Sequence, residues 1–221
     1  MRALIATVVF LVFLALSATV VKNQKKAGDD DGGIKVFFSA DAFDAKGYVD
    51  NIWDAKVLPH VRERAVDYVE LKKAVQAGDR AAIAGFGYRA VEEHNPYNIA
   101  VKARIKILSA NVKSRNGRAE ADVYPFDGEP DFTMLIGPVY KGTSIRDFLD
   151  FVNFDDFKNQ VEFAKLATQL NTKVSEVVVA PLGLLEDGGV GRVFDIYGVT
   201  TEDGSNTNLR VVPVSLVPAA E

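Results

Sequence analysis

The chain has 221 residues, 25% of them charged, a formal net charge of −4 and no cysteine. The lack of cysteine excludes disulfides, cysteine nucleophiles and lipid attached through a cysteine. The acidic balance disfavours a surface for nucleic acid or anionic lipid, because such surfaces are basic.

The N-terminus begins with an apolar run from Ala3 to Val21. About 20 apolar residues cross a bilayer, whereas the apolar part of a cleaved signal peptide spans about 7 to 15. The length therefore predicts that residues 1–21 are a retained membrane anchor. The alternative is a secretory signal that is cleaved after Ser17, where small side chains suit the peptidase.

Three lysines follow the apolar run, at Lys22, Lys25 and Lys26. Positive charge tends to stay in the cytoplasm, so these lysines argue against export of the residues that follow. Residues 22–36 begin with a polar, charged stretch that ends in glycine, and we expect them to form a tether.

Residues 37–97 have helical character and are predicted to form an N-terminal subdomain of two or three helices. Pro59 is expected to break the first helix, while Asp67 and Asp79 are expected to cap the next two. The apolar residues of the first helix fall near the 3.6-residue helical period: Phe43, Val49, Ile52, Trp53 and Val57.

From residue 98 the period changes to two, which predicts strands. Apolar residues from Ile99 to Ile107 alternate with Lys102, Arg104 and Lys106. This basic stripe is typical of the solvated face of an ordinary strand, so we expect no nucleic-acid partner. Asn116-Gly117 is a hairpin signal, and the next two strands are predicted at 119–124 and 132–136.

A helix and two further strands complete the pattern. Ser144 resembles a capping residue, and Asn153 is expected to open a longer helix that Pro181 ends. Strands follow at 193–199 and 209–217. Three strands, a helix and two strands is the order of an OB-like, five-stranded antiparallel barrel, here over residues 98–221. The predicted class is α+β; a curved antiparallel sheet with the helix on one face is the alternative.

Features of enzymes are scarce. His60 and His94 lie in different elements without metal-ligand spacing, and both are predicted to be surface residues. No serine lies in a Gly-x-Ser-x-Gly turn. We therefore expect no catalytic constellation, no metal site and no cofactor.

Several short motifs resemble the uncharacterised family of predicted periplasmic lipoproteins known as domain of unknown function 2291. They are Gly137-Pro138, Gly142-Thr143, Arg146-Asp147, the stretch from Phe154 to Phe163, the segment from Phe43 to Pro59, Pro96-Tyr97 and the ending from Val212 to Leu216. Thr19 stands where lipid-bearing members have their cysteine.

The resemblance implies a protein that faces the periplasm and is held at the bacterial inner membrane, here by one uncleaved apolar segment. Genes of this kind are often neighbours of sugar uptake transporters of the ATP-binding-cassette class, which suggests an accessory role. No reaction is established for the family, so the resemblance brings no catalytic residues.

The best candidates for a binding site in this chain are Arg146, Asp147, Asn159, Gln160 and Glu162. On a helix, Asn159 and Glu162 share a face and Gln160 lies to the side. The structural alternative is that Glu162 pairs with Arg146 while the amides satisfy backbone groups before the helix.

Two functional hypotheses follow. The first is a membrane-tethered, non-catalytic binding or scaffolding protein that recruits a transport component or a solute-binding protein; it predicts an exposed apolar or aromatic patch that includes Trp53. The alternative is a small-molecule-binding or weakly hydrolytic domain, which predicts a concave pocket at Asn159, Gln160 and Glu162.

Overall fold

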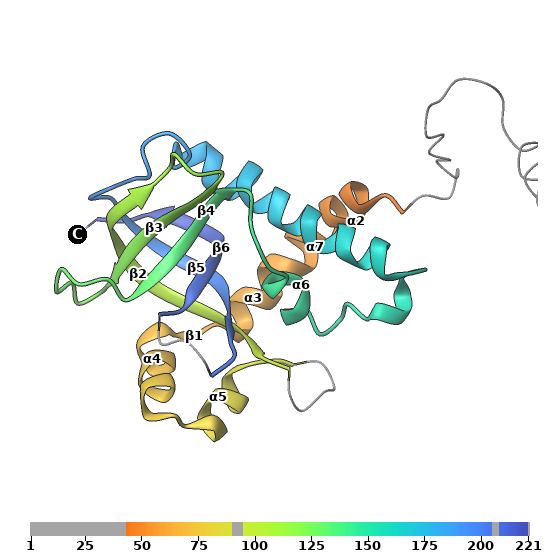
Figure 1. Ribbon diagram of the computed structural model, residues 1–221, viewed down its shortest axis with the longest axis horizontal. Helices are drawn as coiled ribbons and strands as arrows, with labels where there is room; N and C mark the ends of the chain where they lie inside the picture. Colours follow the sequence, from red (N-terminus) through yellow and green to blue (C-terminus); the bar gives the residue numbers. More distant parts are fainter. Residues whose placement is uncertain (1–42, 90–94, 205–207, 221) are drawn as a thin grey trace, which may run out of the picture. The chain divides into compact units, whose positions relative to one another are not determined.

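Five long strands close into a barrel in the computed structural model, which describes residues 43–89, 95–204 and 208–220 (Figure 1). Around the barrel the order is β2, β3, β4, β6 and β5, and β5 pairs again with β2. The strands are β2 (Tyr97–Asn111), β3 (Asn116–Val123), β4 (Phe132–Pro138), β5 (Val193–Glu202) and β6 (Arg210–Pro218). The predicted α+β barrel with a helical segment between its third and fourth strands is therefore confirmed.

One pairing differs from the antiparallel barrel predicted. Strand β4 pairs with β6 in parallel, over Thr133 with Arg210 and Met134 with Val211. The reason is topological, because the helical crossover after β4 and the β5–β6 hairpin bring β6 alongside β4 in the same direction. A two-residue strand, β1 (Val66–Asp67), also pairs in parallel with β2 and was not predicted.

Alternating residues of these strands fill the barrel. Ile99, Ile105 and Ile107 of β2 are fully buried, as the period-two pattern requires. Met134 of β4 and Phe194 of β5 are fully buried as well. The buried side chains of the barrel and the helices form one continuous hydrophobic core.

The first helical segment runs through α2 (Ala45–Ile52), the π-helical turn η1 (Trp53–Val57) and α3 (Leu58–Arg64). Pro59 does not break it, contrary to the prediction. The π turn ends at Val57, two residues before Pro59. The Pro59 nitrogen has no hydrogen, so it cannot donate the regular α-helical hydrogen bond to the preceding turn. The irregular hydrogen bonding of the π turn falls at this point of the helix. The segment packs against the barrel, and its Val49, Val57 and Val61 are fully buried.

The next two helices begin at the predicted caps. Asp67 caps α4 (Tyr68–Ala77) by accepting from the Val69 backbone N–H, and Asp79 caps α5 (Arg80–Phe86) through the Ala82 N–H. Gly78 ends α4 in the left-handed conformation.

The crossover between β4 and β5 contains more elements than the single long helix predicted. It consists of α6 (Ser144–Phe148), the 3-10 turn η2 (Phe154–Asp156), α7 (Gln160–Val174), the π turn η3 (Ser175–Val179) and the 3-10 turn η4 (Ala180–Leu182). Asn153 caps only η2, and Asn159 caps the long helix. In Figure 1, α7 lies beside α2 on one side of the barrel.

The predicted anchor 1–21 and tether 22–36 lie outside the described residues. Residues 43–221 group as one unit by their contacts, and the boundary predicted between 37–97 and 98–221 stays a prediction. Within the described ranges, no helix is both long enough and apolar enough to span a membrane.

Candidate functional site

Three of the predicted site residues lie at the start of α7. Asn159 Oδ1 accepts hydrogen bonds from the backbone N–H groups of Val161 and Glu162, both at 3.0 Å. Glu162 Oε2 accepts from the Lys158 N–H at 3.0 Å, and Gln160 is exposed. Asn159 and Glu162 thus satisfy backbone donors at a helix end, which the structural alternative expected of Asn159 but not of Glu162. Ligand binding by these three residues stays a prediction.

The other two predicted residues, Arg146 and Asp147, are in contact with each other on α6. Arg146 Nε lies 2.7 Å from Asp147 Oδ1, and Arg146 Nη2 lies 2.6 Å from the same oxygen. Thr143 Oγ1 donates to Asp147 Oδ2 at 2.5 Å. Arg146 therefore pairs with its neighbour rather than with Glu162, contrary to the pairing considered from the sequence.

The Arg146 guanidinium also contacts Phe163. Its central carbon lies 3.8 Å from the centre of the Phe163 ring, and Nη1 donates to the Phe163 carbonyl at 3.3 Å. Only 12% of the Arg146 side chain is exposed, against 31% for Asp147. Stacking and hydrogen bonding together fix the orientation of Arg146 and, through it, one oxygen of the Asp147 carboxylate.

Arg146, Asp147 and Phe163 form one wall of a pocket of about 440 Å³, which we call the Arg146–Asp147 pocket. Phe154 lines it with 45% of its surface exposed, and its ring meets the Phe163 ring edge to face. The remaining lining residues are Tyr88, Asn95, Pro96, Asn98, Leu149, Val152, Asn153 and Asp155. The pocket lining therefore combines aromatic rings with amide and carboxylate groups.

The sequence pattern identified only part of this pocket. Phe154 falls within the long helix that was predicted to begin at Asn153, but it lies in the separate turn η2 and is exposed. Asn98 comes from the first barrel strand, where it accepts from Thr201 Oγ1 at 2.8 Å. Asn98 and Thr201 are far apart in the sequence, so the spacing of nearby residues could not predict that Asn98 is buried beside this polar partner.

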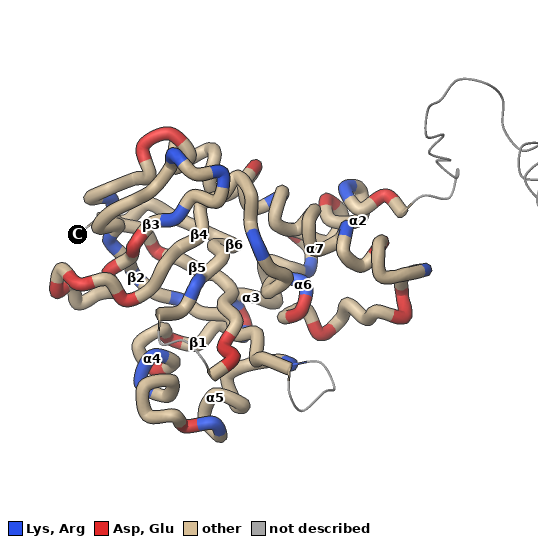
Figure 2. Tube along the Cα trace, viewed as in Figure 1, with Lys and Arg blue, Asp and Glu red and all other residues tan. Residues whose placement is uncertain are grey.

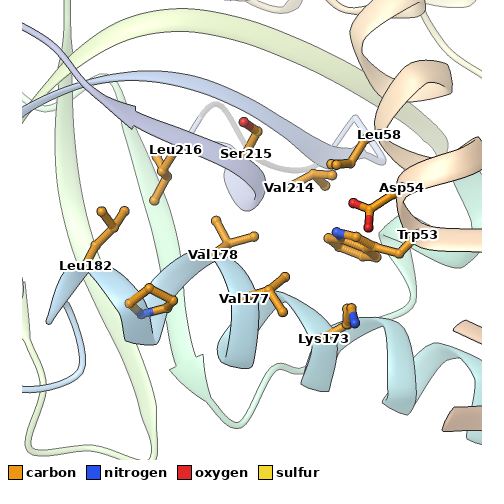
Figure 3. Close-up of a pocket in the computed structure, with 11 residues that line it drawn as sticks. Trp53, Asp54, Leu58, Lys173, Val177, Val178, Leu182, Val214, Ser215 and Leu216 are labelled. Carbon is orange, nitrogen blue, oxygen red and sulfur yellow. The ribbon is translucent and has the colours of Figure 1, made fainter. Parts of the chain in front are cut away.

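A second concavity lies between η1, η3 and β6, and we call it the Trp53 groove. Its volume is about 320 Å³, and apolar side chains such as Val177 and Leu216 line much of it (Figure 3). Trp53 is 2% exposed, so it does not form the exposed aromatic patch predicted from the sequence. Figure 3 shows its indole ring directed toward the groove, with the ring nitrogen on the side of Val178.

Lys173, which lines the Trp53 groove, belongs to a small ion-pair cluster centred on Asp50. Lys173 Nζ lies 2.7 Å from Asp50 Oδ1, and Lys46 Nζ lies 2.6 Å from Asp50 Oδ2. Hydrogen bonds from these two lysines lower the pKa of the Asp50 carboxyl below its ordinary value. The Lys173 charge is therefore compensated by Asp50.

The middle residue of the basic stripe of β2, Arg104, is paired with an acidic residue. Arg104 donates to both carboxylate oxygens of Asp195 on β5, at 2.9 and 3.1 Å. Figure 2 shows acidic and basic positions interspersed along the strands. The Arg104–Asp195 pair places an acidic residue beside the basic stripe, and the expectation of no nucleic-acid partner stays a prediction.

His60 is packed in the interior, which corrects its prediction as a surface residue. Its ring meets the rings of Phe148 and Phe151 edge to face, and its Nε2 lies 3.6 Å from Asp150 Oδ1. Burial, followed by the nearby positive charge of Arg64, lowers the pKa of His60 below its ordinary value. His94 lies outside the described residues, and no group of three or more His, Asp or Glu that could hold a metal lies inside them.

Comparisons with known proteins agree with this fold. The sequence pattern of the family described as "Predicted periplasmic lipoprotein (DUF2291)" matches residues 7–217. The structure is similar to that of an OB-fold protein from Thermotoga maritima, with a TM-score of 0.65 and 22% identity over 80% of this chain and 99% of that chain. That likeness concerns the fold alone. No curated protein matches the sequence significantly.

Proposed function

Because the chain belongs to the DUF2291 family of predicted periplasmic lipoproteins, we propose that it is a non-catalytic binding protein facing the periplasm. Its ligand is a small neutral molecule rich in hydroxyl groups, of the sugar class, bound in the Arg146–Asp147 pocket. The single observation that carries the proposal is the placement of a fixed Arg146–Asp147 pair beside the exposed ring of Phe154.

The chemistry of the pocket fits such a molecule. A sugar has apolar C–H faces, which pack on aromatic rings, and hydroxyl groups, which both donate and accept. Phe154 and Phe163 supply rings, while Asp147 and Asn98 supply groups that pair with hydroxyls. A volume of about 440 Å³ lies within the range of about 300–1,000 Å³ usual for small-molecule sites.

Preorganisation favours binding over catalysis. Arg146 is held by Asp147 and Phe163 before any ligand arrives, so little side-chain freedom is lost on binding. Arg146 and Thr143 both donate hydrogen bonds to the Asp147 carboxylate, so its two oxygens are held in place to accept a further hydrogen bond from a ligand hydroxyl.

The cellular role proposed is that of an accessory to a sugar uptake transporter of the ATP-binding-cassette class. A single-pass anchor at residues 1–21 would hold the domain at the inner membrane, where it would meet the transporter or its solute-binding protein. The gene neighbourhood typical of such families supports this role, and the sugar-compatible chemistry of the pocket is consistent with it.

The test is isothermal titration calorimetry of the full chain with a panel of neutral pentoses, hexoses and disaccharides, in a detergent without a sugar headgroup. We expect at least one member of the panel to bind. F154A should weaken its binding about two- to tenfold, as expected for loss of an aromatic contact. D147N should weaken it about tenfold or more, because a charged acceptor is lost.

The matched control is V161A, since Val161 is 63% exposed at the start of α7 and does not line the pocket. This variant should bind the same sugar with unchanged affinity. If no sugar of the panel binds, or if F154A and D147N bind it as the unmodified chain does, the proposed ligand class is wrong.

A further inference from the structure

We propose that Thr143 and Thr201 are positioning residues of the Arg146–Asp147 pocket. Thr143 fixes Asp147 as a hydrogen-bond acceptor, and Thr201 fixes Asn98 as a donor. The inference rests on the proposed function and adds the polarity of recognition: one hydroxyl of the sugar donates to Asp147 Oδ2, and another oxygen accepts from Asn98 Nδ2. The ligand class is thereby narrowed to sugars with a free hydroxyl at the position that faces Asp147.

The backbone of Asn98 is held on both sides. On one side it exchanges two hydrogen bonds with Tyr88, at 2.8 and 2.9 Å, and on the other it lies opposite Thr201 of β5 in the antiparallel ladder. The N–H and C=O of Asn98 are directed to Tyr88, so Asn98 and Thr201 form a pair without backbone hydrogen bonds between them. Side chains come closest in such pairs. The ladder therefore brings the Thr201 hydroxyl to the Asn98 amide.

Thr201 decides which end of the Asn98 amide the pocket receives. Thr201 Oγ1 donates to Asn98 Oδ1 at 2.8 Å. Asn98 is only 5% exposed and lines the pocket, and its Nδ2 has no hydrogen-bond partner within residues 43–89, 95–204 and 208–220. An amide carries its acceptor on the oxygen and two donors on the nitrogen. Because the oxygen is engaged by Thr201, Asn98 presents a donor to the pocket.

Thr143 has the same role for Asp147. The Asp147 backbone N–H donates to the Thr143 carbonyl at 2.9 Å, and Thr143 Oγ1 donates to Asp147 Oδ2. Asp147 Oδ1 already accepts from two nitrogens of Arg146, whereas Oδ2 accepts only from Thr143 among the described residues. A carboxylate oxygen has about two positions that accept hydrogen bonds. One position on Oδ2 is therefore left for a ligand hydroxyl.

The two threonines act from outside the pocket. Neither lines the Arg146–Asp147 pocket, and both line a neighbouring concavity of about 300 Å³. The two hydrogen-bonded pairs, Thr143 with Asp147 and Thr201 with Asn98, thus run between the two concavities. Loss of either threonine hydroxyl removes no group that touches the sugar, so any effect on binding is transmitted through its partner.

A measurement without ligand tests how Asn98 is held. NMR relaxation of the Asn98 side-chain amide is compared among the unmodified full chain, T201V and T201S, in a detergent without a sugar headgroup. T201V keeps the shape of threonine but lacks the hydroxyl, so we expect the order parameter of the amide to fall. T201S keeps the hydroxyl and should keep the amide ordered. An amide that is equally ordered in T201V would overturn the positioning role.

Calorimetric titration tests the polarity of recognition. The probes are D-glucose, D-galactose, D-xylose and D-ribose, each with its monodeoxy and monodeoxyfluoro analogues. Fluorine accepts hydrogen bonds weakly and cannot donate them. At the hydroxyl that faces Asp147, fluorine should lower the affinity as much as hydrogen does, about tenfold. At the oxygen that faces Asn98, fluorine should keep more affinity than hydrogen. Recovery by fluorine at every position, or at none, would overturn the proposed polarity.

The threonine variants connect the two results. T143V and T201V should each weaken binding of the sugar about three- to tenfold, and T143S and T201S should bind more tightly than the valine variants. The matched control is T168V, because Thr168 is exposed on α7 and its hydroxyl donates to the Ala164 carbonyl at 3.2 Å. T168V should bind as the unmodified chain does.

Two outcomes separate this inference from the proposed function. If a sugar binds and the valine variants of Thr143 and Thr201 bind it as tightly as the unmodified chain, the positioning role is wrong while the sugar site stands. If no probe binds the unmodified chain but T201V still loosens the Asn98 amide, the positioning role is supported and the proposed sugar ligand is wrong.

Discussion

The Arg146–Asp147 pocket and the Trp53 groove differ in how their polar groups are satisfied. In the pocket, Arg146 and Asp147 pair with each other and with Phe163 and Thr143. In the groove, the polar groups of Trp53, Asp54 and Ser215 have no hydrogen-bond or ion-pair partner among the described residues. Groups that are already paired with one another hold a fixed geometry and suit a small ligand that joins an existing network, whereas solvent-accessible groups without a protein partner are hydrated and less constrained.

The largest expected change in the free energy of unfolding comes from substitution of Trp53. W53A should lower the free energy of unfolding by about 3–5 kcal/mol, because a large buried side chain leaves a cavity. W53F should lower it far less, since the ring is mostly retained and the lost N–H had no partner. Urea denaturation followed by circular dichroism measures both. Equal losses would show that the indole N–H contributes to the folded state, contrary to its unpaired placement.

A smaller effect is expected at the pocket. R146A should destabilise the protein by about 2–4 kcal/mol, because Asp147 loses a charged partner and Phe163 loses its stacked guanidinium. R146K should recover only part of this loss, since lysine cannot donate from a planar fork. If R146A unfolds at the same urea concentration as the unmodified chain, the pair does not preorganise the pocket.

The polar groups of the groove should contribute almost nothing to stability. D54N and S215A are expected to change the free energy of unfolding by less than about 0.5 kcal/mol, because neither removes an intramolecular hydrogen bond. The same denaturation assay applies. A loss comparable to that of R146A would mean that these groups make stabilising interactions in the folded state, contrary to their placement.

The smallest expected effect is a dependence of stability on pH, which arises from the Asp50 carboxyl near the Trp53 groove. Lys173 and Lys46 lower the pKa of Asp50 from its ordinary 3.8, so the folded state favours the ionised form. Its contribution is present above that value and is lost as the pH falls through the lowered pKa. D50N should therefore cause a small loss of stability at neutral pH that disappears in acid. A D50N loss that stays constant from neutral pH into acid would contradict the ion pairs.

Much of the barrel could be predicted because its signal is local. Ile99, Ile105 and Ile107 recur with period two, and Asn116-Gly117 marks the first hairpin, so strands and their order follow from the sequence alone. The parallel contact between β4 and β6 could not be predicted, since it depends on how the crossover returns to the barrel.

The start of α7 shows that a capping signal in the sequence can be ambiguous. Asn153 precedes Asp156 by three residues, and Asn159 precedes Glu162 by the same spacing, so both have the form of a cap. In the structure, Asn153 caps a 3-10 turn and Asn159 caps α7. Packing decides between them, because Phe157 is buried between the two caps and fixes a bend in the chain.

Both candidate sites combine residues far apart in the sequence. Arg146 and Asp147 were identified because they lie in a conspicuous motif, whereas Asn98 joins them only through the barrel. The Trp53 groove depends on two π turns and on the contact of η3 with β6. A π turn of five residues is too short to change the apolar pattern of the helix that contains it. The pattern around Trp53 therefore predicted a regular helix.

The most direct test of the binding function is hydrogen–deuterium exchange of the full chain with and without a concentrated mixture of neutral pentoses and hexoses. A ligand in the Arg146–Asp147 pocket should slow exchange in α6 and η2, over residues 144–156, and leave η1 and η3 unchanged. Protection confined to η1 and η3, or no protection in any segment, would contradict the assignment of the sugar site.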